Sequence, residues 1–202
     1  MIALDPSPAM LAALREQASG HRIANVRTIE GRWPLDPASG PPPNAPSAAG
    51  APPAADVALI ANLGYDVEAI GEFLDAMEKA AGRLCVAILA DGQPSRPAHA
   101  FWPPVHGEER VELPALDAFL DLLRARGREP RVARVPRPAR GFASRDELTG
   151  WLRNQLFVES GSAKDAVLGR ELDQRVVEHA DGSVGLSTQV PMLTGIVTWE
   201  PR

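Results

Sequence analysis

The sequence predicts an α/β fold, built on a doubly wound and mostly parallel sheet with helices on both faces. Two apolar stretches, residues 56–64 ("DVALIANLG") and 83–92 ("RLCVAILADG"), lack polar alternation, which is typical of strands covered on both faces. An amphipathic stretch over 65–82 separates them, and strand, helix, strand is the order of a parallel crossover unit. With 202 residues and 45% hydrophobic content, we expect a single domain over residues 1–202.

The first elements are a short strand and a helix. The apolar run before Asp5 is typical of a strand end, Ser7 is suited to cap a helix, and Pro8 fits its first position. Alternation over residues 25–33 predicts a second strand that ends at Gly31.

The middle of the chain combines a proline-rich loop with the crossover helix. Residues 34–55 hold eight of the 20 prolines, and we expect an extended loop there because proline fixes φ and removes a backbone donor. In the helix over 65–82, Asp66 is suited to the N-cap and Gly82 to the C-terminal end.

The last ninety residues predict a helix, a strand pair and an insertion. A loop is expected over 93–113 and a helix over 114–126, followed by strands at 129–135 and 195–200. Two capping boxes, "SRDE" and "SAKD", open helices between these strands, the second carrying Leu168, Leu172 and Val176. Residues 144–180 therefore form a predicted helical insertion.

Composition argues against several classes of function. The net charge is −5 and the chain has no Lys/Arg-rich run, so we expect no nucleic-acid partner. No apolar run approaches the ~20 residues of a membrane span, and we expect a soluble, cytoplasmic protein. Cys85 lies in an apolar run and is interpreted as a buried small hydrophobe. The four histidines are scattered, so no metal site is expected.

Ligands of a doubly wound sheet bind outside the carboxyl ends of its strands. Four places qualify: Asp5 to Ser7, Gly31 to Trp33, Asn62 to Tyr65, and the loop after Leu89. A carboxylate that ends a strand can accept hydrogen bonds from both hydroxyls of a ribose. The alternative for Asp5 is a turn or helix-capping role.

Three stretches carry a resemblance to a known family. "ALDPSPAMLAALRE", "NVRTIEGRW" and "DVALIANLGYDVEAIGEFLDAMEKAAGRLCVAIL" resemble the second to fifth strands of class I S-adenosylmethionine-dependent methyltransferases, whose sheet is Rossmann-like. The later helix and strand pair match the end of that fold. The resemblance implies S-adenosylmethionine as cofactor and methyl transfer to an unidentified acceptor, with a small molecule as the expected partner.

The resemblance also implies cofactor-binding positions, which are Asp5, Ser7, Met10, Arg32, Trp33, Asn62, Leu63 and Gly64. Asp5 would bind the ribose, Ser7 and Met10 would lie near the adenine, and residues 62–64 would lie beside the methionine portion. The family often places an acidic residue after its third strand, where this chain has Arg32 and Trp33. Trp33 can stack on the base or can belong to the core.

The acceptor side is expected around Tyr65 and the segment "FWPPVHGEERVEL" (101–113). Its two aromatic residues can form an acceptor wall, and His106 or Glu108 can take a proton from an oxygen or nitrogen nucleophile. The alternative is a solvated loop. Methyl transfer needs mainly alignment and desolvation, so a base is optional.

The largest departure from the family is its glycine-rich turn, which follows the family's first strand and has no counterpart here. We therefore expect a longer natural product, with that strand encoded before Met1. For the chain as given, we expect weak cofactor binding and pairing with another chain, including as a homo-oligomer. Two other classes of function stay open. They are a non-catalytic methyltransferase-like fragment or interaction module, and a nicotinamide-dependent oxidoreductase that shares the acidic strand end.

Overall fold

The computed structural model describes residues 1–35, 54–62, 67–93, 95–188 and 191–202. The predicted proline-rich loop therefore lies almost entirely outside the described residues. The chain divides into two compact units. The first comprises Met1–Leu59, Glu68–Val86 and Trp199–Arg202, and the second comprises Ile60–Val67 and Ala87–Thr198. The expectation of a single domain stays a prediction.

A small parallel sheet opens the first unit. Strand β1 (Ile2–Asp5) pairs with β2 (Arg27–Glu30) in a register that places Asp5 opposite Glu30. Helix α1 (Pro8–Gly20) connects them, and the Met10 backbone N–H donates to the Ser7 Oγ at 3.3 Å. The predicted cap and the first-turn proline are confirmed, and β2 ends at Glu30, one residue before the predicted Gly31.

Helix α2 (Ile70–Ala80) runs directly into strand β4 (Ala81–Ala90). The sequence predicted that Gly82 closes the helix, and this boundary was wrong, because Ala81 already has extended backbone and Gly82 lies inside the strand. The proposed cap, Asp66, lies outside the described residues. Leu74 and Met77, which the periodic pattern of this helix predicts on its apolar face, are buried, and Phe73 is buried as well.

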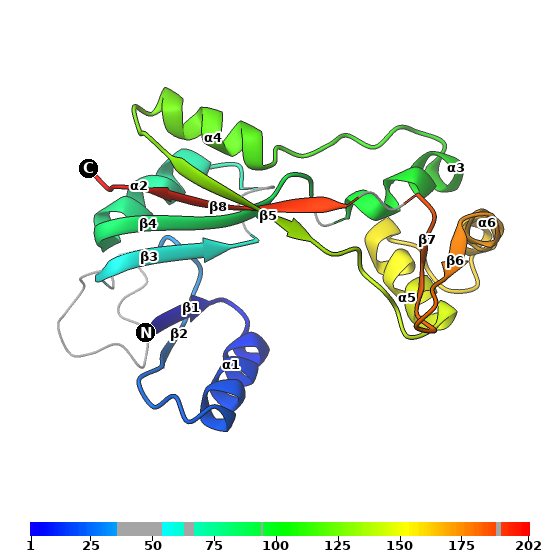
Figure 1. The fold of residues 1–202 in the computed structure, drawn as a ribbon, viewed down its shortest axis with the longest axis horizontal. Helices are drawn as coiled ribbons and strands as arrows, with labels where there is room; N and C mark the ends of the chain where they lie inside the picture. The colour runs from blue at the N-terminus through cyan, green and yellow to red at the C-terminus, as the bar shows by residue number, and fades with distance from the viewer. Residues whose placement is uncertain (36–53, 63–66, 94, 189–190) are drawn as a thin grey trace. The chain divides into compact units, whose positions relative to one another are not determined.

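Four strands form the larger sheet, in the order β3-β4-β8-β5 (Figure 1). Strands β3 (Ala55–Ala61) and β4 are parallel, because a Cβ on Gly82 would lie beside Ala55 and the Asn62 N–H donates to the Ile88 carbonyl at 2.9 Å. Strand β8 (Met192–Trp199) runs antiparallel to β5 (Arg131–Arg137), which stands at one edge. The predicted strand pair at one edge of an α/β sheet is confirmed.

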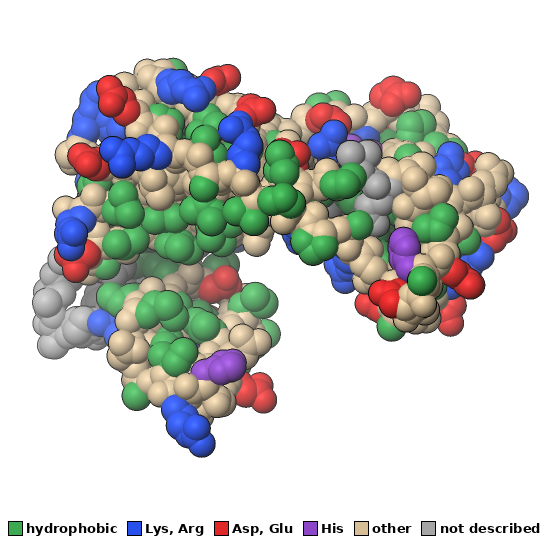
Figure 2. Space-filling model, viewed as in Figure 1, with side chains coloured by type: hydrophobic (Ala, Val, Ile, Leu, Met, Phe, Trp, Pro, Cys, Tyr) green, Lys and Arg blue, Asp and Glu red, His purple; other side chains and the backbone are tan. Residues whose placement is uncertain are grey.

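Strand β3 differs from its prediction. Val57 and Leu59 are 47% and 59% exposed, whereas Cys85, Ala87 and Leu89 of β4 are buried. The expectation that both apolar strands are covered on two faces was therefore wrong for β3. The physical reason is its place in the strand order, since among the described strands β3 pairs with β4 alone. Figure 2 shows hydrophobic side chains exposed over this part of the sheet.

Residues 96–106 after β4 are helical, which corrects part of the loop expected over 93–113, whereas residues 107–113 form no helix or strand. A 3₁₀ helix, η2 (Arg96–Phe101), continues into α3 (Trp102–His106). Both begin with proline in the first turn, where its missing N–H costs no helical hydrogen bond. Helix α4 (Leu116–Ala125) follows, confirms the helix predicted over 114–126, and buries four apolar residues. These are Leu116, Phe119, Leu120 and Leu123.

The insertion contains two helices and a hairpin. Helices α5 (Arg145–Leu156) and α6 (Ala163–Asp173) begin at Ser144 and Ser162, whose hydroxyls accept backbone N–H groups as the capping boxes predicted. Helix α6 ends at Asp173, so Val176 lies in strand β6 (Val176–Glu178), paired with β7 (Val184–Leu186), and its helical prediction was wrong. These elements bury a hydrophobic core of their own together with η2 and α3. No helix in the described part of the chain is long and apolar enough to cross a membrane.

Candidate functional site

Within the first unit, the carboxyl ends of β1 and β2 lie side by side. The Gly31 N–H donates to the Asp5 carbonyl at 3.2 Å, and the Ser7 N–H donates to Asp5 Oδ1 at 2.7 Å. Asp5 therefore holds the turn into α1. Its second carboxylate oxygen, Oδ2, has no hydrogen-bond partner among the residues that the structure describes. The turn-forming interpretation of Asp5 and a ligand-binding role for Oδ2 are compatible.

The other predicted residues of this unit gather at the same end of the small sheet. Trp33 is half-buried, and its indole N–H donates to the Phe73 carbonyl of α2 at 3.3 Å. Arg32 and Met10 are exposed. The indole is thus fixed to α2 by its nitrogen.

The end of β3 carries the second predicted group. Asn62 has a φ of 54°, in the left-handed region that few residues other than glycine adopt. Asparagine tolerates this region better than most residues, and such positions gather at functional sites. Leu63, Gly64 and Tyr65 lie outside the described residues.

His106 joins α3 to the insertion through both ring nitrogens. Its Nε2 lies 2.9 Å from the Leu156 carbonyl, which can only accept, so Nε2 carries the proton. Nδ1 then accepts from the Lys164 ammonium at 3.0 Å. Neither nitrogen is free to take a proton in this arrangement. Glu108 is exposed on the turn after α3.

The two aromatic residues expected as an acceptor wall pack elsewhere. Phe101 is fully buried in the core of the second unit. Trp102 stacks on the His106 ring at a centroid distance of 4.1 Å, and the Arg110 guanidinium lies 4.5 Å from the Trp102 ring. The wall interpretation was therefore wrong for Phe101, while Trp102 contributes to the stack that holds His106.

Sequence reasoning overlooked a polar pair that follows β4. Gln93 is buried, and its amide nitrogen lies 2.5 Å from Nε2 of His99. Burial lowers the pKa of His99, nearby Arg110 lowers it further, and Glu112 partly opposes this. His99 is thus a neutral imidazole near neutral pH. The sequence feature that could have indicated His99 is its position, nine residues after the end of β4 and at the edge where ligands of such sheets bind.

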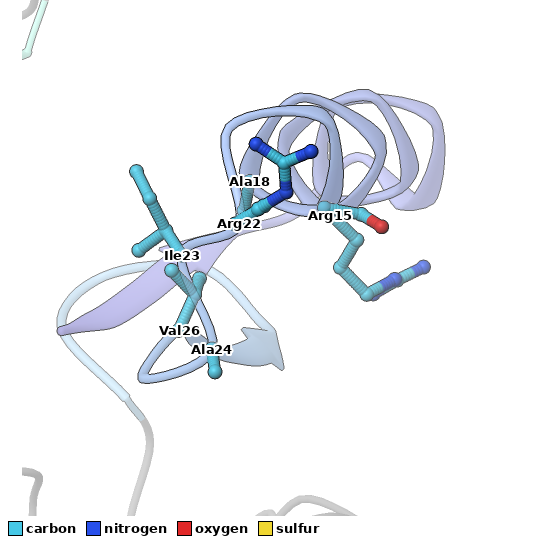
Figure 3. A pocket seen from close by; sticks show the side chains of 7 residues that line it. Arg15, Ala18, Arg22, Ile23, Ala24 and Val26 are labelled. Carbon is cyan, nitrogen blue, oxygen red and sulfur yellow. The ribbon is translucent and has the colours of Figure 1, made fainter.

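A shallow hollow lies at the opposite end of α1 (Figure 3). It has a volume of about 410 Å³ and is lined by the last turns of α1 and the segment that leads into β2. Arg15 at its rim donates to the Thr28 hydroxyl at 2.9 Å. Because the hollow is remote from the carboxyl ends of β1 and β2, it is not part of the candidate site.

Solved structures share this fold. A putative methyltransferase from Bacillus halodurans C-125 is 10% identical over 100% of this chain and 83% of its own, with a TM-score of 0.54. The YcgJ protein from Bacillus subtilis is also 10% identical, over 100% and 82%, with a TM-score of 0.52. A precorrin-6y C5,15-methyltransferase from Geobacter metallireducens GS-15 is 14% identical over 98% of this chain, with a TM-score of 0.45. The chain spans 66% of that enzyme's length.

No model of a protein family matches the sequence, and no curated protein matches it. The similarity is therefore one of fold.

Proposed function

We propose that this chain, whose fold is that of class I methyltransferases, transfers a methyl group from S-adenosylmethionine to a small-molecule acceptor. The fold alone does not carry the proposal, since many activities share one fold. The observation that carries it is Asp5. Its carboxylate ends β1 beside the end of β2, one oxygen is held by the Ser7 N–H, and the other is free among the described residues.

The chain's residues fit a nucleoside at this end of the small sheet. Oδ2 of Asp5 can accept from the ribose hydroxyls while Oδ1 keeps the carboxylate oriented. Ser7 and Met10 at the start of α1 and Arg32 and Trp33 after β2 are proposed to surround the adenine, since β1 and β2 end side by side. Asn62, Leu63 and Gly64 are proposed for the methionine portion.

The chemistry asks little of the protein beyond alignment. When bound, S-adenosylmethionine supplies a methyl carbon to which the acceptor's lone pair bonds as the carbon–sulfur bond breaks. The acceptor's proton passes to a base or to water. Tyr65, His106 and Glu108 are the proposed acceptor-side residues, and His106 would first have to lose its contact with Lys164. His99, neutral and half-buried, is a further base at the same edge of the sheet.

Binding of the demethylated product, S-adenosylhomocysteine, tests the proposal directly. Titration followed by ligand-observed NMR detects binding even when its affinity is weak. Asp5→Asn should weaken binding about tenfold or more, the size of a lost hydrogen bond to a charged group. Glu16→Gln, an exposed carboxylate on α1, is the matched control and should leave binding unchanged. Absence of saturable binding, or tighter binding of NADH, would overturn the proposal.

A second candidate function, a non-catalytic interaction module, is favoured by the sheet edges. Among the described strands, β1 pairs only with β2, and β3 only with β4. An open edge presents unpaired backbone groups that can accept a strand from another chain. If the chain binds no nucleoside but sediments as a homo-oligomer, with the β3 amides slow to exchange, this candidate replaces the first.

A further inference from the structure

The second unit contains a cavity of about 220 Å³ between the end of β5 and the insertion. Its walls include Arg137 at the end of β5, Arg140 and Phe142 in the segment that follows, Trp151 and Gln155 of the insertion, and Met192 at the start of β8. An apolar cavity of about 150 Å³ holds benzene, so this one has room for a single ring with a small substituent.

Two aromatic rings and a cation form one side of the cavity. The Phe142 and Trp151 rings lie 5.5 Å apart between centroids, and both pack in or against the core of the insertion. The Arg140 guanidinium lies 4.8 Å from the Phe142 ring and 5.7 Å from the Trp151 ring. Contact with the two rings holds the guanidinium at the cavity. The rings provide a planar apolar surface beside it.

The charge of the cavity is positive and uncompensated. Arg137 and Arg140 have no carboxylate partner among the described residues. Some arginines of the second unit are paired, with contacts of 2.8 Å between Arg134 and Asp117 and between Arg153 and Asp165. Two free guanidiniums at one cavity attract an anion, and guanidinium geometry matches a carboxylate or phosphate.

The position of the cavity in the sheet is one where ligands are expected to bind. Arg137 is the last residue of β5, so the cavity opens at the carboxyl end of that strand, where ligands of doubly wound sheets bind. The adjoining start of β8 is tied to the end of β4, because the Leu193 N–H donates to Asp91 Oδ1 at 3.1 Å. The cavity thus lies at the same edge as the segment after β4.

We propose that this cavity binds a small aromatic carboxylate, with the ring against Trp151 and the carboxylate between Arg137 and Arg140. The ligand is an anion because the two guanidiniums lack partners, and it is aromatic because the wall beside them is Phe142 and Trp151. The binding site stands on the cavity alone. Its assignment as the methyl-acceptor site rests on the proposed function.

The test is calorimetric titration of the whole chain with benzoate, with benzamide as the neutral isostere and inorganic phosphate as the anion without a ring. Benzoate should bind saturably and at least about tenfold more tightly than either comparison ligand. Arg140→Gln and Arg137→Gln should each weaken benzoate about tenfold. Arg131→Gln, an exposed arginine at the other end of β5, is the control and should change affinity less than twofold.

Each outcome decides the proposal. If benzamide binds as tightly as benzoate, the arginines do not recognise the charge of the ligand, and the proposal is wrong. If phosphate binds as tightly as benzoate, the ligand is not selected for an aromatic ring, and the proposal is also wrong. Equal weakening by Arg131→Gln shows a general charge effect and overturns the site. Thermal melts confirm that the variants fold. Because benzoate is titrated without cofactor, failure of S-adenosylhomocysteine binding with intact benzoate binding overturns the methyltransferase assignment and leaves this site standing.

Discussion

Gly195 is the position where β8 leaves no room for a side chain beneath α4. A Cβ there would lie 2.5 and 2.6 Å from the two methyl carbons of Leu116 and 3.1 Å from its Cγ. Leu116 is fully buried, so it has little space into which to move. Ordinary contact begins at 3.4 Å, so Gly195→Ala requires a shift of about 0.9 Å.

Overpacking of this kind costs about 1–3 kcal/mol, and the loss of glycine's backbone freedom returns about 0.5–1 kcal/mol. We therefore expect Gly195→Ala to lower the free energy of unfolding by about 1–2 kcal/mol. For a chain of this length, that corresponds to a fall in Tm of roughly 2–8 °C. Urea titration followed by circular dichroism, together with a thermal melt, measures both quantities.

Gly169 supplies the control, because it lies inside α6 with nothing within 4 Å of its Cβ position. Gly169→Ala should stabilise the chain by up to about 1 kcal/mol, the helix-propensity difference. The double variant Gly195→Ala/Leu116→Ala should lose less unfolding free energy than the sum of the losses of the two single variants, because the smaller side chain at position 116 removes the clash. Strict additivity, or a neutral Gly195→Ala, would refute the packing argument.

Three further predictions concern the second unit. The pKa of Asp165 is lowered chiefly by its hydrogen bond from Arg153, so Asp165→Asn should destabilise the chain at pH 7, and urea titrations should show this difference vanishing as pH falls through the lowered value. The pKa of His99 is lowered below 6.5 by burial, so the unfolded chain binds more protons just below that pH. Thermal melts between pH 5 and 8 should then show wild-type stability falling on acidification and His99→Asn falling less. Ser144→Ala should cost about 1 kcal/mol of unfolding free energy, because the Glu147 N–H loses its acceptor, and a urea midpoint unchanged by the substitution would contradict this.

The caps at Ser7, Ser144 and Ser162 could be predicted because a helix start depends on residues within one turn. The helical segment over 96–106 could have been recognised by the same logic, since its prolines stand in first turns rather than interiors. The loop predicted over 93–113 did not take these positions into account.

The remaining features depend on partners far along the chain. The exposure of β3 follows from its place in the strand order, which its own apolar sequence does not contain. His106 is held by Leu156 and Lys164, which are 50 and 58 residues away, so its engaged nitrogens could not be inferred locally. The cavity beside Arg140 is likewise assembled from β5, the insertion and β8.

The core of the insertion has a consequence for how this protein can change over evolutionary time. Its buried leucines come from α5, α6 and β7 and pack within the second unit, whereas Arg137 and Arg140 are exposed. Substitutions of exposed residues carry small stability costs. The ligand preference of this unit can therefore drift through such positions while the insertion stays folded, so chimeras that exchange the segment after β5 are a practical route to new specificities.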